Sequence, residues 1–176
     1  MNHGFPVLIG KDKIALRVKE MAGQLAQQYQ GRPLVVVGLM SGVFIFMADL
    51  VRAADFAAQT GFYWLESYQG TQSTGHVRVK QDLNIDVSGK SVLIVDDILD
   101  TGGTLRFARE KMLEKGAVSV EAAVLLRKEN NLGDPELAEY IGFPIPNEFV
   151  IGYGLDFDGQ YRHLPDICIL PDDRKP

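Results

Sequence analysis

The sequence has only one cysteine, Cys168, and no excess of basic residues, because 23 acidic residues against 18 Lys and Arg give a net charge of -5. One cysteine cannot form an internal disulfide bond, so a reducing cytoplasm suits the chain better than secretion. General nucleic-acid-binding proteins usually present a basic surface, which this chain lacks. Residues 1–13 do not show the basic start and apolar stretch of a signal peptide. We therefore expect a cytoplasmic protein whose partners do not include nucleic acid.

The sequence also has no long uninterrupted apolar run. Its most apolar segment, residues 33–51, is broken by Gly38, Ser41, Gly42 and Asp49. A membrane-spanning helix needs ~20 consecutive and mostly apolar residues. The segment therefore favours a buried strand, a turn and a helix, and we expect no contact with a membrane.

The sequence does contain alternating helical and strand patterns, with 46% hydrophobic residues in a chain of 176. Apolar residues at helical spacing predict helices over residues 14–29, 44–57 and 105–115. Short apolar and β-branched runs predict strands over residues 34–39, 62–67, 77–79, 92–95, 118–126, 141–143, 149–153 and 167–170. Strands that alternate with helices and are apolar on both faces indicate an α/β fold with a mostly parallel sheet flanked by helices. A chain of this length is expected to form a single domain, 1–176.

The stretch VLIVDDILDTGGTL, residues 92–105, runs from an apolar strand into a helix start. Ligands of parallel α/β sheets bind beyond the carboxyl ends of the strands, so this loop and the loop 38–43 are expected at the working edge. Two glycines let the backbone approach a ligand, and the amides of a helix N-terminus attract anions. Residues 101–104 therefore predict a phosphate site. Neither a Walker loop nor a dinucleotide-binding glycine pattern is present.

Three aspartates, Asp96, Asp97 and Asp100, stand immediately before this predicted phosphate site. Carboxylates would repel a bare phosphate, so they suit a ligand that also carries hydroxyl groups or a metal ion. Adjacent carboxylates can accept hydrogen bonds from two ribose hydroxyls, and they can also hold Mg²⁺. The alternative is that Asp100 or Thr101 simply caps the following helix.

The stretch VLIVDDILDTGGTL resembles the phosphoribosyl-pyrophosphate motif of type I phosphoribosyltransferases. Further segments are similar to the hypoxanthine-guanine branch of that family: GLMSGVFIFMADL, ESYQGTQSTG, the Lys128 region, EYIGFPIPNEFVIGYGLDF and YRHLP. The resemblance covers about residues 8–170. It implies the type I fold with a small hood from the terminal segments, and the use of Mg²⁺. It also implies purine salvage, in which a 6-oxopurine and phosphoribosyl pyrophosphate give a nucleoside monophosphate and pyrophosphate, and a homodimer or homotetramer.

The resemblance also assigns roles around the motif. Asp96 and Asp97 would contact the ribose hydroxyls and the metal, although the family often has Glu at the first position. The 5-phosphate would be held by Thr101, Gly102, Gly103 and Thr104. Asp100 would lie near the incoming base as the catalytic residue, accepting a proton or stabilising positive charge on the sugar.

The loop 39–42 resembles the pyrophosphate loop of the family, in which a cis peptide bond precedes a residue that is commonly Lys or Arg. The matching bond joins Met40 to Ser41, so the amides of Ser41 and Gly42 would face pyrophosphate. Because Ser41 carries no charge, we expect pyrophosphate to depend on Mg²⁺, backbone amides and Arg162. The alternative is an ordinary turn in which Ser41 caps a helix.

The purine site is expected from the later segments. Lys128 matches the lysine that donates to the exocyclic oxygen of a 6-oxopurine, Tyr140 the stacking aromatic residue, and Ile141 the backbone that reads the ring edge. Asn147 stands where the family commonly has Asp, which weakens a metal role there. Solvation of Lys128 and half-buried packing of Tyr140 are the alternatives.

A lid is expected from Ser67 and Tyr68 onward, through the polar residues 69–76, to exclude water during transfer. An exposed loop without a ligand role is the alternative.

Two other functions remain open. The chain could transfer phosphoribose to another base, such as xanthine or uracil, or it could be an RNA-binding regulator on the same fold. Lys128 and the YIGF segment argue against the first, and the acidic charge argues against the second.

Overall fold

The computed structural model describes residues 4–67, 77–129 and 135–171. Its main sheet has six strands in the order β4-β3-β2-β5-β6-β7. Their bounds are β2 Leu34–Met40, β3 Gln59–Ser67, β4 Val77–Gln81, β5 Ser91–Leu99, β6 Ser119–Lys128 and β7 Tyr140–Ile145. All neighbouring strands run parallel except β4, which pairs antiparallel with β3 at the edge. The mostly parallel sheet expected from the sequence is therefore confirmed.

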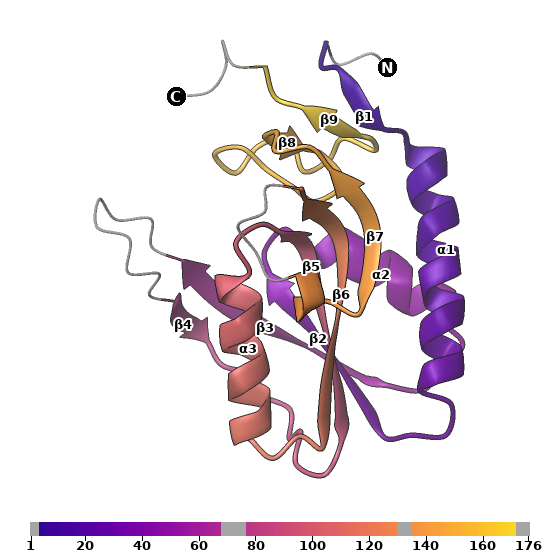
Figure 1. Ribbon diagram of the computed structural model, residues 1–176, viewed down its shortest axis with the longest axis vertical. Helices are drawn as coiled ribbons and strands as arrows, with labels where there is room; N and C mark the ends of the chain where they lie inside the picture. The colour runs from indigo at the N-terminus through magenta and orange to yellow at the C-terminus, as the bar shows by residue number, and fades with distance from the viewer. Residues whose placement is uncertain (1–3, 68–76, 130–134, 172–176) are drawn as a thin grey trace.

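Helices cover both faces of this sheet (Figure 1). Helices α1 (Lys11–Gln28) and α2 (Phe44–Ala53) pack on one face, and α3 (Gly103–Glu114) packs on the other. The central strand β2 serves both layers, because its alternating residues Leu34 and Val36 join the first core and Val35 and Val37 join the second. This double burial explains why the strand reads as a continuous apolar run.

A second, smaller sheet joins the two terminal segments of the chain at one end of the molecule (Figure 1). It consists of β1 (Val7–Ile9), β9 (Ile167–Ile169) and β8 (Val150–Ile151) in the order β1-β9-β8. Both pairings are antiparallel. A short 3-10 helix, η1 (Pro135–Leu137), precedes β7.

Two boundaries differ from the sequence prediction in ways that affect the site. Strand β5 continues to Leu99 instead of ending at residue 95, because β6 still pairs with it there, with Leu99 opposite Arg127. Asp96 and Asp97 therefore lie within the strand, which fixes their backbone. Helix α2 ends at Ala53, four residues before the expected end. Within the described residues, no helix is long and apolar enough to cross a membrane.

Candidate active site

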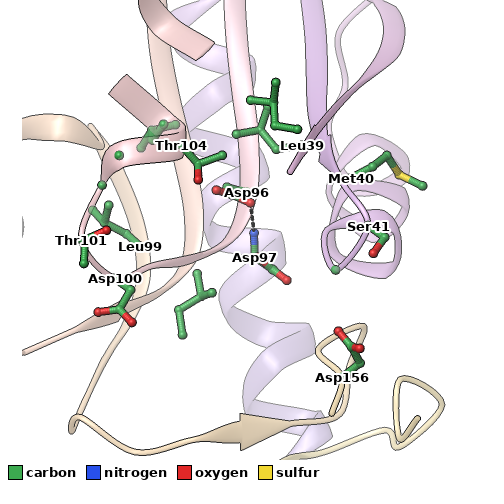
Figure 2. A pocket seen from close by; sticks show the side chains of 16 residues that line it. Leu39, Met40, Ser41, Asp96, Asp97, Leu99, Asp100, Thr101, Thr104 and Asp156 are labelled. Atoms are coloured by element: carbon green, nitrogen blue, oxygen red, sulfur yellow. Dashed lines mark hydrogen bonds between the residues drawn. The ribbon is translucent and has the colours of Figure 1, made fainter. Parts of the chain in front are cut away.

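The carboxyl ends of β2 and β5 lie side by side and border a cavity of about 370 Å³. Its lining comes from residues 39–42 at the end of β2 and just after it, residues 96–105 around the end of β5, and Leu65 and Asp156. Figure 2 shows Asp97 between the turn at 100–104 on one side and the Ser41 loop on the other. The two loops that the sequence placed at the working edge therefore do meet at one cavity.

Asp96 and Asp97 are held close together by the strand that carries them. The backbone N–H of Asp97 donates to Oδ1 of Asp96 at 3.0 Å (Figure 2). Burial raises the pKa of both carboxyls, and the charge of Asp97 raises the pKa of Asp96 further. The positive charge of Arg162 opposes this effect at Asp97 by lowering its pKa. Crowded carboxylates of this kind are stabilised by a ligand that brings hydroxyl donors or a cation.

Gly42 lies against the carboxylate of Asp97. A Cβ added at residue 42 would lie 1.6 Å from Oδ2 of Asp97, so a side chain at this position would displace the carboxylate. The end of β5 and the loop after β2 are therefore in direct contact, and the glycine makes this contact possible.

The turn between β5 and α3 presents a helix N-terminus to the cavity. The N-cap position is occupied by Gly102, which has a left-handed φ of 80° and no side chain with which to cap the helix. The alternative that Asp100 or Thr101 caps the helix is therefore wrong. A Cβ at Gly102 would lie 2.4 Å from Cδ1 of Leu137, so the turn also packs tightly against η1. Helix amides without a side-chain cap are suited to an anion such as a phosphate.

A second cavity, of about 250 Å³, adjoins the first. Four residues line both cavities: Asp97, Ile98, Asp100 and Asp156. The second cavity is completed by Lys128, Phe149, Val150 and Leu155. The site thus has two compartments that share their acidic wall.

Lys128 ends β6 and points toward Asp100. Its Nζ lies 3.1 Å from Oδ2 of Asp100, and its side chain is only 15% exposed. A solvated lysine, which was the alternative, does not fit this placement. The ammonium group thus lies where it can donate to a ligand in the second cavity.

Tyr140 and Ile141 are not at this edge of the sheet, which corrects the sequence prediction. Tyr140 begins β7 and pairs with Ala123, whereas Lys128 pairs with Ile145 at the other end of that strand. Five residues of strand correspond to roughly 16 Å. Neither Tyr140 nor Ile141 lines the two cavities described above.

The hydroxyl of Tyr140 and the backbone of Ile141, for which we expected a role in purine binding, make other contacts. The hydroxyl of Tyr140 donates to Oε2 of Glu121 at 3.0 Å. The carbonyl oxygen of Ile141 accepts a hydrogen bond from Nη2 of Arg17 at 2.8 Å. Asn147 is an exposed residue between β7 and β8 and lines neither described cavity. Packing, the alternative for Tyr140, describes its role better than stacking on a base.

Sequence reasoning missed several residues of this site, among them Phe149, Val150 and Asp156. They follow the carboxyl end of β7, whereas Tyr140 stands at its beginning. The signal that could have found them is the rule that parallel strands present ligands to residues beyond their carboxyl ends. Phe149 is 40% exposed, which leaves part of its ring available to a ligand.

The loop after β2 contains a cis peptide bond between Met40 and Ser41, as the resemblance implies. The N-cap of α2 is Val43, so the alternative in which Ser41 caps this helix is wrong. Instead, Oγ of Ser41 accepts a hydrogen bond from Nη2 of Arg162 at 2.9 Å. Arg162 is therefore brought to the same loop as Ser41 by the fold.

The predicted lid lies largely outside the part of the chain that the structure describes. Tyr68 and residues 69–76 belong to that undescribed segment. Ser67 is the last residue of β3, and it pairs with Val77 of β4. The lid therefore stays a prediction.

Comparison with known families identifies the class of protein to which this fold and site correspond. The model of the phosphoribosyl transferase domain matches residues 10–158. The chain therefore belongs to the phosphoribosyltransferase family, as its motif indicates.

Its similarity is, more particularly, to hypoxanthine-guanine phosphoribosyltransferases. The enzyme of that name from Streptococcus pneumoniae strain R6 is 41% identical over 168 residues, which are 95% of this chain and 93% of the relative. The one from Staphylococcus aureus strain Mu50 is 42% identical over 165 residues, or 93% and 92% of the two chains. A crystal structure of a hypoxanthine phosphoribosyltransferase from Staphylococcus aureus matches with a TM-score of 0.89 at 42% identity, covering 95% of this chain and 91% of the other.

Proposed function

We propose that the chain is a purine-salvage enzyme. It transfers the 5-phosphoribosyl group from phosphoribosyl pyrophosphate to hypoxanthine or guanine, giving IMP or GMP and pyrophosphate. The observation that carries this proposal is the pair of adjoining cavities. One has carboxylates and a helix N-terminus suited to a sugar phosphate, and the other has Lys128 and Phe149, which suit a base.

The sugar phosphate occupies the larger cavity in this proposal. Asp96 and Asp97 accept hydrogen bonds from the two ribose hydroxyls. The 5-phosphate binds to the loop formed by Thr101, Gly102, Gly103 and Thr104. This arrangement is supported by the start of α3 at Gly103, because Gly103 and Thr104 line the cavity and the first amides of a helix carry partial positive charge.

Asp100 is the proposed catalytic residue because it lines both cavities. As a purine nitrogen forms its bond to the anomeric carbon, the bond from that carbon to pyrophosphate breaks. The carboxylate of Asp100 can accept the proton that the purine loses. Its negative charge also favours the cationic character that the sugar develops between the two bonds.

Lys128 and Phe149 are proposed to select the base. The Lys128 ammonium donates to the exocyclic oxygen of a 6-oxopurine, whereas adenine presents an amino group, which is itself a donor. The Phe149 ring offers an apolar surface on which a purine can stack. Lys128 also contacts Asp100, so base recognition and proton acceptance are adjacent.

The residues present suit Mg²⁺ as the metal. Asp96 and Asp97 supply oxygen atoms, and Mg²⁺ typically binds to one or two carboxylates together with substrate phosphates and water. Among the described residues, no group of three or more His, Cys, Asp or Glu forms a metal site, which fits a metal held jointly with its substrate. When bound, Mg²⁺ would neutralise charge on the pyrophosphate.

Pyrophosphate is proposed to leave from the loop formed by Met40, Ser41 and Gly42, with Arg162 beside it. The support is the contact between Ser41 and Arg162, which adds a cation to a loop that has none of its own.

We also propose a homodimer or homotetramer in the cytoplasm. Phe62 and Trp64, on one face of β3, are 43% and 37% exposed and offer apolar surface for a second copy; light scattering would give the oligomeric state.

A panel of bases tests the proposed activity. With phosphoribosyl pyrophosphate and Mg²⁺, we expect turnover of hypoxanthine and guanine and little turnover of adenine or uracil, measured as nucleotide formed. Turnover confined to adenine or uracil would remove the role given to Lys128. Absence of turnover with all bases, together with tight RNA binding, would favour the regulator.

A further inference from the structure

The described lining of the larger cavity contains negatively charged side chains and no positively charged ones. Among the described residues that line it, four are aspartates, namely Asp96, Asp97, Asp100 and Asp156, and none is Lys or Arg. A pyrophosphate would add further negative charge beside them, so a cation must come from outside the lining.

Arg162 is positioned to supply this charge. Its Nη2 lies 2.8 Å from Oδ1 of Asp156 and 2.9 Å from Oγ of Ser41. Its Nη1 donates to the carbonyl oxygen of Gly154 at 2.6 Å. The side chain is 24% exposed, so the guanidinium is held by three contacts but remains reachable.

The segment that carries Arg162 is packed directly against the loop after β2. A Cβ added at Gly154 would lie 2.3 Å from the carbonyl oxygen of Gly42. Gly154 and Arg162 are themselves linked by a backbone hydrogen bond of 3.0 Å from Gly154 N–H to the Arg162 carbonyl. The backbones on the two sides of the Ser41–Arg162 bond are thus fixed relative to each other.

Ser41 is the single side chain of the loop 41–42 that reaches the guanidinium. A serine hydroxyl can accept hydrogen bonds through its oxygen while it donates its own hydrogen. With the oxygen facing Arg162, the hydroxyl hydrogen can be donated to an anion in the cavity. A guanidinium held only by Asp156 and Gly154 would lose the contact that directs it toward the loop.

We propose that Ser41 is a positioning residue, whose hydroxyl holds the Arg162 guanidinium over the loop 41–42 so that arginine and serine bind pyrophosphate as one unit. This inference rests on the proposed function of Arg162. The unit supplies, from a residue far along the chain, the positive charge that the loop itself lacks.

The test is a double-mutant cycle with steady-state kinetics in both directions. Ser41→Ala should raise KM for phosphoribosyl pyrophosphate and, in the reverse reaction, for pyrophosphate by about tenfold. This is the effect expected from loss of one charge-assisted hydrogen bond. KM for hypoxanthine should change little. Ser41→Thr, which keeps the hydroxyl, should restore most of the affinity.

Non-additivity separates positioning from an independent contact. Arg162→Ala should raise KM for pyrophosphate by more than Ser41→Ala does, and the double variant should lose clearly less affinity than the two single effects added together. Adding Ser41→Lys to Arg162→Ala should recover part of the lost affinity, because a cation then returns to the same place. Ser119→Ala is the matched control, since it removes a serine hydroxyl bonded to Ser91 Oγ at 2.9 Å at the other end of the sheet.

The possible failures are distinguishable. If Arg162→Ala leaves KM for pyrophosphate unchanged, the proposed role of Arg162 is lost and the inference with it. If Arg162→Ala weakens pyrophosphate but Ser41→Ala does not, or if the two effects simply add, the role of Ser41 as a positioning residue is overturned. Should Ser41→Ala fail to fold, KM for pyrophosphate is compared among Ser41→Thr, Ser41→Lys and the native protein. A Ser41→Thr variant that loses the affinity for pyrophosphate although it keeps the hydroxyl would overturn the role of Ser41.

Discussion

Both ends of the main sheet carry half-buried acidic side chains, but these side chains have different surroundings at the two ends. At the amino end, Glu121 accepts hydrogen bonds from Gln28 Nε2 at 3.1 Å, from the Tyr29 hydroxyl at 2.8 Å and from the Tyr140 hydroxyl at 3.0 Å. At the carboxyl end, Asp96 and Asp97 lie beside each other, and burial raises the pKa of both.

This contrast teaches how to separate structural carboxylates from functional ones. A carboxylate whose oxygens are satisfied by donors from its own chain holds the fold together. Carboxylates that lie close together beside a cavity are stabilised by a bound ligand that brings hydrogen-bond donors or a cation, and they mark a candidate functional site. Tyr140 illustrates the distinction, because its motif suggested the site while its hydrogen bond to Glu121 ties it to the structural end.

The largest expected effect is at the carboxyl end. Asp100→Ala should lower kcat by ~10²–10⁴, the range typical for loss of a residue that transfers a proton in the transition state. Steady-state rates with hypoxanthine and phosphoribosyl pyrophosphate measure this. Glu121→Gln, at the amino end, is the comparison and should leave kcat near the native value. An Asp100→Ala enzyme with native kcat would remove Asp100 from catalysis.

An intermediate effect distinguishes the two aromatic residues. Phe149→Ala should raise KM for hypoxanthine by about tenfold, because stacking of a base on an aromatic ring contributes about 1–3 kcal/mol. Tyr140→Phe should leave that KM unchanged, since its ring lies at the other end of β7. The two KM values, measured side by side, check the corrected purine pocket. A larger effect from Tyr140 than from Phe149 would restore the original expectation.

The smallest effect concerns stability at alkaline pH. Burial and, after it, the neighbouring Glu121 raise the pKa of Tyr140 from 10.0 to about 12, and the pKa of Tyr29 is raised for the same reasons. Because the folded state holds these protons more tightly than the unfolded state, the contribution is fully present below pH 10 and is lost as pH rises through about 12. Urea midpoints should therefore fall over this window. A Tyr140→Phe variant should show a shallower decline, and an equal slope in both proteins would contradict the assignment.

Much of the fold could be predicted from the sequence because the signals are local. The apolar run that forms β2 and the glycine-rich turn before α3 can each be predicted from the residues of that segment alone. The extent of β5 could not be predicted in this way, because pairing with β6 continues it through Asp96 and Asp97. The continuous apolar run ends at residue 95, whereas the hydrogen-bonded strand continues to Leu99.

The candidate site was predictable where a single motif carries it and failed where tertiary pairing decides. The cluster of Asp97, Asp100 and the turn after them is contiguous in sequence. Tyr140 was misplaced because the position of β7 relative to the sheet edge depends on its register with β6. The bond between Ser41 and Arg162 joins residues 121 positions apart, and no local pattern reveals it.

The close approach of Gly42 to the Asp97 carboxylate has a consequence for variation in this protein. The two positions cannot change independently, because even a methyl group at 42 would push the acid group out of its place. Any side chain introduced at position 42 would therefore also displace the carboxylate that we propose binds the ribose, so the proposed pyrophosphate and ribose subsites cannot be altered separately at this point.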